Sequence, residues 1–136
     1  MLRLVVFGLA LMVVAACGGS KEARAVESLP ETPLMCADVE DVVITAEEGR
    51  MFRFDVTVRS ADTGWDKYAD AWEVRAPNGS VLGTRTLAHP HVDEQPFTRS
   101  LTGVEIPADI TQVEVAARDL VDGFCGTVVG VVVPRP

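Results

Sequence analysis

The chain lacks the short motifs that identify many enzymes and nucleic-acid-binding proteins. It has no Gly-x-Ser-x-Gly sequence around a nucleophilic serine, and the glycines at 123 and 126 precede an expected strand instead of the helix that a phosphate-binding loop requires. Basic residues are scarce, since 12 Lys and Arg face 20 Asp and Glu, and they form no patch. We therefore expect a protein that is not an enzyme and that binds no nucleic acid.

The chain also lacks an apolar run long enough to cross a bilayer. The apolar stretch from Leu4 to Val14 follows Arg3 and is broken by Gly18-Gly19-Ser20, whereas a spanning helix needs roughly 20 apolar residues. An early positive charge, a short apolar run and small residues at its end are typical of a secretory signal peptide. Residues 1–16 are therefore predicted to be a signal helix that is removed from the mature protein.

Val14-Ala15-Ala16-Cys17 resembles the lipobox of bacterial lipoproteins. The resemblance implies that Cys17 becomes the first residue and carries palmitate or similar acyl chains, each buried methylene contributing about 0.8 kcal/mol of membrane affinity. The partner would then be a lipid bilayer of the cell envelope. Gly18 is not the aspartate associated with inner-membrane retention, which implies the outer membrane, facing the periplasm, in a Gram-negative host. The alternative is an ordinary secreted protein, cut near Ala16, with a free thiol at Cys17.

Cysteine is scarce, with three residues in 136. If Cys17 carries the lipid, Cys36 and Cys125 remain as a single pair, which an oxidising compartment would join as a disulfide. Such a bridge would stabilise the fold by about 4 to 5 kcal/mol in the chain-entropy model. Two free, buried thiols are the alternative.

The mature chain is long enough for one domain. Residues 17–35 contain two prolines and no sustained apolar periodicity, so we expect a lipidated, flexible tether. Residues 36–136 would form the folded domain. Removal of Arg3 with the signal leaves 11 basic and 20 acidic side chains, a net charge of −9 that disfavours anionic membrane surfaces as well as nucleic acid.

Alternating apolar and polar residues predict antiparallel strands that are buried on one face. The pattern is strongest at 51–59, where Phe52, Phe54, Val56 and Val58 alternate with polar residues, and it recurs at 112–118. The other expected strands are 39–46, 71–75, 81–87, 97–102 and 127–133, with Pro77-Asn78-Gly79-Ser80 as a hairpin turn. The spacing predicts an all-β fold: an antiparallel two-sheet sandwich of about seven strands.

The sandwich resembles immunoglobulin-like domains in architecture, because Trp72 lies on the third expected strand, where those domains often place a core Trp. The cysteines do not have immunoglobulin spacing, since Cys36 precedes the first strand and Cys125 lies in the last loop. A small jelly roll or an open barrel is the alternative.

Both histidines of the chain lie in the segment 89–96. In an extended chain His89, His91 and Asp93 would share one side, and with Glu94 they would offer nitrogen and oxygen ligands suited to copper or zinc. The alternative is a rigid connection in which prolines fix the path and Glu94 meets solvent or Arg99. Without metal, histidines near carboxylates would become charged near or above neutral pH.

A second cluster, at 62–72, mixes carboxylates with large aromatic side chains. Trp65, Asp66, Tyr68 and Asp70 are the candidate ligand surface, because flat rings with polar edges suit a sugar or a protein partner. The order of acidic residues differs from an EF-hand loop, so a calcium site would need ligands from other loops. The alternative is a core Trp, a turn and solvated carboxylates. In an immunoglobulin-type sandwich Asp66, Tyr68 and Phe124 would share one end.

Gly64-Trp65-Asp66, Tyr68-Ala69-Asp70, Trp72 and residues 89–100 resemble a group of uncharacterised bacterial exported proteins with no established activity. The sequence therefore predicts a membrane-anchored envelope lipoprotein that acts as a non-catalytic binding module for an envelope protein or a small ligand. The alternative is a periplasmic lipoprotein that binds copper or zinc through His89-Pro90-His91.

Overall fold

The computed structural model describes residues 35–135, which form seven strands and contain no helix. The predicted signal peptide 1–16, Cys17 and the tether up to residue 34 lie outside these residues. No membrane-spanning helix is found within the described part of the chain. The strands are β1 (Asp38–Ala46), β2 (Met51–Arg59), β3 (Ala69–Arg75), β4 (Val81–Thr86), β5 (Phe97–Glu105), β6 (Gln112–Asp119) and β7 (Val129–Val132).

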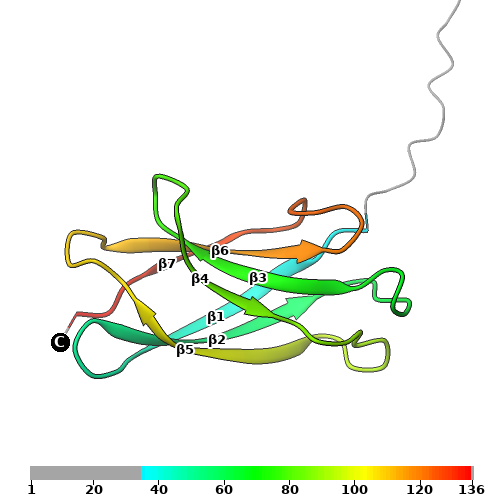
Figure 1. Cartoon of the computed structure of the whole chain (residues 1–136), viewed down its shortest axis with the longest axis horizontal. Coiled ribbons are helices and arrows are strands. Elements are labelled where there is room, and N and C mark those ends of the chain that lie inside the picture. The colour runs from blue at the N-terminus through cyan, green and yellow to red at the C-terminus, as the bar shows by residue number, and fades with distance from the viewer. Residues whose placement is uncertain (1–34, 136) are drawn as a thin grey trace, which may run out of the picture. The chain divides into compact units, whose positions relative to one another are not determined.

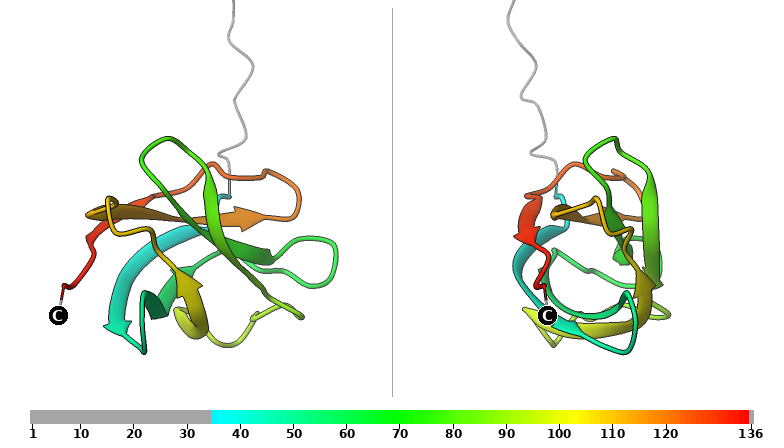
Figure 2. Two further views of the ribbon diagram at one scale, coloured as in Figure 1. Left: turned by 60° about the vertical axis from the view of Figure 1, so that its left-hand side comes forward. Right: turned by 90° about the vertical axis from the view of Figure 1, so that its left-hand side faces the viewer.

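The strands form two antiparallel sheets that pack face to face (Figures 1 and 2). One sheet has the order β1-β2-β5 and the other the order β4-β3-β6-β7. The predicted all-β sandwich of seven strands is confirmed. In constant-type immunoglobulin domains the fourth strand joins the sheet of the first two, whereas here β4 pairs with β3. The immunoglobulin-like comparison therefore remains a resemblance of architecture.

The alternation in β2 places its apolar residues between the sheets. Phe54, Val56 and Val58 are fully buried, and the polar residues between them lie on the outer face. The opposite sheet supplies Trp72, which is fully buried, to the same core. Burying a large aromatic side chain stabilises the fold by roughly 1.5–3 kcal/mol relative to its exposure, so these inward rows determine how the sheets pack.

The observed strands differ from the predicted ones mainly at their ends. β3 begins at Ala69, two residues before the predicted start, and β5 continues to Glu105. β7 is shorter than the predicted 127–133, because Thr127 bonds to the first strand instead of β6: its N–H donates to Asp38 Oδ1 over 2.7 Å, and its carbonyl accepts from Val39 N over 3.0 Å.

The disulfide between Cys36 and Cys125 is confirmed, with the two Cα atoms 5.4 Å apart. It joins the segment before β1 to the loop between β6 and β7. The two segments approach so closely that a Cβ atom on Gly126 would lie 2.0 Å from the carbonyl oxygen of Ala37. Glycine is therefore required at 126 for steric reasons.

Candidate functional site at the loop end of the sandwich

Three loops and the start of β1 meet at one end of the sandwich, which we call the loop end (Figure 1). They are residues 60–68 between β2 and β3, residues 87–96 between β4 and β5, and residues 120–128 between β6 and β7. Leu120 N donates to the carbonyl of Tyr68 over 2.9 Å, and His91 N donates to Asp62 Oδ2 over 2.8 Å. Both predicted clusters, 62–72 and 89–96, therefore lie at the same end.

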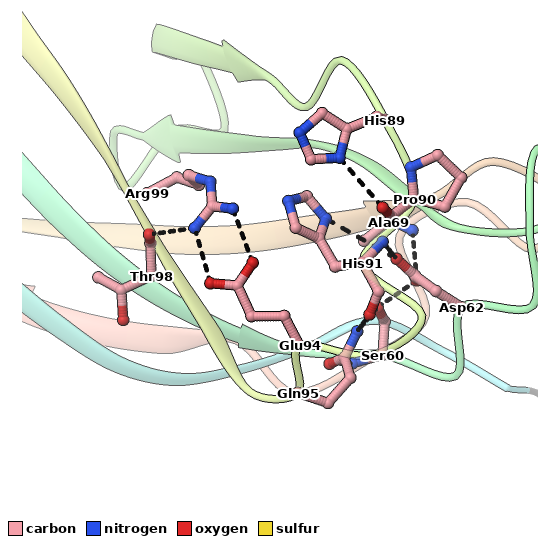
Figure 3. Close-up of polar contacts among 10 residues, drawn as sticks. All are labelled: Ser60, Asp62, Ala69, His89, Pro90, His91, Glu94, Gln95, Thr98 and Arg99. Carbon is pink, nitrogen blue, oxygen red and sulfur yellow. Dashed lines mark hydrogen bonds and ion pairs between the residues drawn. The ribbon is translucent and has the colours of Figure 1, made fainter.

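Asp62 holds two of these loops together from a buried position. Its Oδ1 accepts hydrogen bonds from Ser60 Oγ at 2.5 Å and from Ala69 N at 2.9 Å, while its Oδ2 accepts from His91 N (Figure 3). The Gln95 side chain adds a parallel link, because it accepts from Ser60 N at 2.9 Å and donates to the carbonyl of His91 at 3.0 Å. A buried carboxylate with several donors stabilises loops that have no strand partners.

The two histidines have different environments, although their ring centroids are only 4.6 Å apart. His91 is 4% exposed and stacks on Phe97 at a centroid distance of 3.8 Å. Neither of its ring nitrogens has a hydrogen-bond partner, and Nδ1 lies 3.9 Å from Asp62 Oδ2. The His89 ring is exposed, with Nδ1 3.0 Å from the carbonyl of Pro90. His91 therefore acts as a core aromatic residue.

The titration expected for unmetallated histidines is wrong for His91. Burial lowers the pKa of His91, and the positive charges of Arg99 and His89 lower it further, while Glu94 and Asp62 act in the opposite direction. The sequence showed the nearby carboxylates but not the burial of the ring. Desolvation penalises the charged imidazole, so His91 remains neutral at a pH where a free histidine is partly charged.

The geometry does not support the predicted metal site. Glu94 is turned towards Arg99, with Oε2 2.9 Å from Arg99 Nη2 (Figure 3). Asp93 is exposed. No group of three or more His, Cys, Asp or Glu side chains within residues 35–135 is arranged to hold a metal ion. The segment instead matches the alternative expectation, in which Glu94 meets Arg99.

The predicted ligand surface is only partly assembled. Trp65 is 67% exposed and packs edge-on against Tyr68, with ring centroids 5.9 Å apart, and Asp66 beside it is also exposed. Asp70 instead pairs with Arg118 on β6, at 2.8 and 2.7 Å. The surface that is open to a partner therefore consists of Trp65, Asp66 and the exposed part of Tyr68.

An ion-pair cluster that the sequence analysis did not single out fixes the loops at 62–68 and 119–123. Lys67 Nζ lies 2.8 Å from both Asp119 Oδ1 and Asp122 Oδ2. Burial acts to lower the pKa of Lys67, but the hydrogen bonds to Asp119 and Asp122 outweigh it and raise the pKa. Asp119 is 1% exposed, and burial acts to raise its pKa, yet the bonds from Lys67, Asp122 N and Val121 N hold it below the usual value.

A signal for this cluster was present in the sequence. The inward positions of β6 are Val113, Val115 and Ala117, and Asp119 continues that alternation as an acidic residue on a buried face. A charge at an inward position indicates a buried partner. Nothing in the sequence indicated that the partner is Lys67.

A shallow, open cavity of about 760 Å³ lies where the chain enters the domain. Its lining combines the disulfide with Met35, Arg59, Ser60 and Gln95. The loop end thus carries the entry of the chain, the disulfide and the exposed aromatic surface together.

The chain is 41% identical over 110 residues to a protein of Halomicrobium mukohataei described as "Putative lipoprotein". The aligned region covers 80% of this chain and 54% of the relative, so the chain spans about half the length of the curated relative that it matches. No family model matches the chain, and no solved structure matches it.

Proposed function

We propose that the chain is an exported lipoprotein, anchored to the cell envelope through acylated Cys17, whose β-sandwich is a non-catalytic binding module. The observation that carries the proposal is the 41% identity over 110 residues to the protein described as "Putative lipoprotein". It agrees with the lipobox-like segment Val14–Cys17 of the sequence. The description gives no membrane of residence, so the outer-membrane expectation stays a prediction.

The disulfide supports export. Bonds between cysteines persist in oxidising compartments and are rare where thiols are kept reduced. Cys36 and Cys125 are paired, which leaves Cys17 as the one remaining cysteine of the sequence and therefore free to carry a lipid.

The environment of His91 supports a binding role over a catalytic one. A histidine that serves as a general base needs a ring nitrogen within hydrogen-bonding reach of the group it deprotonates. Both ring nitrogens of His91 are buried, so this imidazole is not open to a substrate. The exposed Trp65 beside Tyr68 instead offers contact area for a partner.

Metabolic labelling with radioactive palmitate tests the anchor. The full chain expressed in its own host should incorporate label, and Cys17→Ser should abolish it, because no other residue occupies the lipobox-like position. Cys36→Ser is the matched control and should retain the label. An unlabelled wild-type chain, or equal labelling of Cys17→Ser, would contradict lipid attachment at Cys17.

A further inference from the structure

Large apolar side chains are exposed mainly at the loop end. The neighbouring turns 64–67 and 119–123 present Trp65, Leu120 and Val121, which are 67%, 47% and 63% exposed. We call these three residues the apolar tip. The turns lie side by side, since Leu120 N bonds to the carbonyl of Tyr68, whose ring packs against Trp65. Exposed apolar side chains gathered on adjacent turns mark an interaction site more often than isolated ones do.

The tip is held firmly by the polar groups behind it. Lys67 bridges the two turns by its pairs with Asp119 and Asp122, and Asp119 Oδ1 also accepts hydrogen bonds from Val121 N at 2.8 Å and Asp122 N at 3.0 Å. The apolar side chains are therefore presented outward at little further cost in conformational entropy on binding.

The chemistry of the tip fits the boundary between lipid headgroups and acyl chains. Trp is favoured at that depth, because its ring is apolar and its N–H can meet the wet headgroups. The one cation of the two turns, Lys67, already pairs with two carboxylates, and Asp66 next to Trp65 is exposed. The tip therefore suits shallow contact with a zwitterionic surface and not electrostatic adsorption on anionic lipid.

The position of the chain entry favours a membrane as the partner of the tip. Cys36 is bonded to Cys125 in the same loop that carries Leu120 and Val121, so the chain enters the domain at the loop end. The 18 residue-to-residue steps from Cys17 to Met35 can span at most roughly 65 Å when fully extended. A lipid on Cys17 would thus connect the bilayer to the end that carries the apolar tip, which places the tip within reach of the membrane.

We propose that the apolar tip rests on the bilayer that anchors the chain, with Trp65 at headgroup depth and Leu120 and Val121 beside it. This inference rests on the proposed function and names the lipid surface as the partner of the loop end. It gives the domain a fixed orientation, in which the turns joining β1 to β2 and β5 to β6 face away from the membrane.

Tryptophan fluorescence tests the contact, because the chain has two tryptophans and Trp72 is fully buried in the core. The lipidated protein would be reconstituted into phosphatidylcholine vesicles that contain brominated phosphatidylcholine. We expect bromine to quench the emission of the wild type and to leave Trp65→Phe unquenched. Aqueous iodide should quench Trp65 less on vesicles than in detergent-free buffer, by roughly twofold for a ring at headgroup depth.

Two matched variants assign the contact to the tip. Leu120→Ser with Val121→Ser should reduce bromine quenching of Trp65, whereas Val132→Ser, at a valine of β7 that is 72% exposed, should not. Protein that floats with the vesicles, but whose Trp65 remains fully open to iodide and unquenched by bromine, would overturn the inference while leaving the lipid anchor intact.

A second preparation separates this inference from the anchor itself. Cys17→Ser with an N-terminal hexahistidine tag would be held on phosphatidylcholine vesicles by a nickel-chelating lipid. Bromine quenching of Trp65 in this preparation supports the tip contact even if the native chain carries no lipid. Its absence overturns the tip contact, and a tip that is shielded only when other membrane proteins are added would assign the site to a protein partner instead.

Discussion

The two ends of the sandwich are built on different principles. The loop end is held by buried side chains and a disulfide: Asp62 accepts three hydrogen bonds, and Lys67 joins two turns. The opposite end, with the β1–β2 turn and the β5–β6 connection, is held by short backbone turns, such as the 2.8 Å bond from Glu47 N to the Met51 carbonyl. Its ion pair between Arg50 and Glu105 has both side chains 60% exposed.

The difference shows what holds each end in place. Short turns satisfy their own backbone groups, so they need few side chains to hold them. Loops of up to ten residues leave backbone donors that must find buried acceptors, and the residues that supply them also fix what is exposed. Stability at the loop end should therefore depend on a few named side chains, which the following variants test.

The largest effect is expected from removing the disulfide. Cys36→Ala with Cys125→Ala opens a loop of 89 residues and should lower the free energy of unfolding by about 4 to 5 kcal/mol in the chain-entropy model. Urea unfolding of the wild type and of the double variant measures the difference. A loss below about 1 kcal/mol would mean that the loop end is held without its covalent link.

Removing one side-chain hydrogen-bond acceptor at each end compares the two ends directly. Asp62→Ala leaves Ala69 N and His91 N without their acceptor inside the protein, so we expect a loss of about 3 kcal/mol. Glu47→Ala, at the opposite end, removes an exposed acceptor of Gly103 N and should change stability by less than about 0.5 kcal/mol. Similar losses of stability for the two variants would contradict the claim that buried side chains hold only the loop end.

The ion pairs provide a second comparison. Lys67→Met leaves Asp119 buried without its cation and should destabilise the protein by about 2 kcal/mol, measured by urea unfolding. Arg50→Met removes an ion pair that water already surrounds and should have no measurable effect. If Lys67→Met were as neutral as Arg50→Met, the two turns would be joined by their backbone alone.

The smallest effect concerns pH and depends on His91. Its pKa in the folded state lies below that of the unfolded chain, so the unfolded state binds the proton more readily. The contribution of neutral His91 to the free energy of unfolding is therefore fully present above the unfolded pKa of about 6.5. It falls as the pH drops below that value, by at most about 1.4 kcal/mol per pH unit. His91→Phe should flatten the dependence between pH 6.5 and 5, because the pKa values of the Asp55, Glu94 and Asp119 carboxyl groups lie below their ordinary values and these groups titrate at lower pH.

Thermal unfolding at several pH values between 5 and 7.5 measures this dependence. We expect a smaller slope of stability against pH for His91→Phe than for the wild type, because the phenyl ring fills the buried position without binding a proton. Equal slopes for the two proteins would mean that burial of His91 does not influence its protonation.

Much of the fold could be predicted from the sequence, because strand patterns are local. The bounds of β2 agree with the alternation at 51–59, and each predicted strand has a counterpart. The bounds of β7 could not be predicted in the same way, since Thr127 pairs across the sandwich with Asp38 and Val39, a contact far away in the sequence.

The candidate site could be predicted less completely than the fold. The positions of His89 and His91 in an extended segment predicted a metal site. Such a pattern shows only which side chains share a face and not whether that face is buried. His91 lies in the core because Phe97 stacks on its ring. The partners of Asp62 and Lys67 come from three different loops, so no local pattern could indicate them.

The central claim is that the domain is exported and anchored by a lipid on Cys17, and intact-mass spectrometry of the protein taken from its own membranes tests it most directly. The account predicts a chain that begins at Cys17 and carries the added mass of acyl chains, with Cys36 and Cys125 oxidised. A chain that retains residues 1–16 and has an unmodified thiol at Cys17 would contradict it.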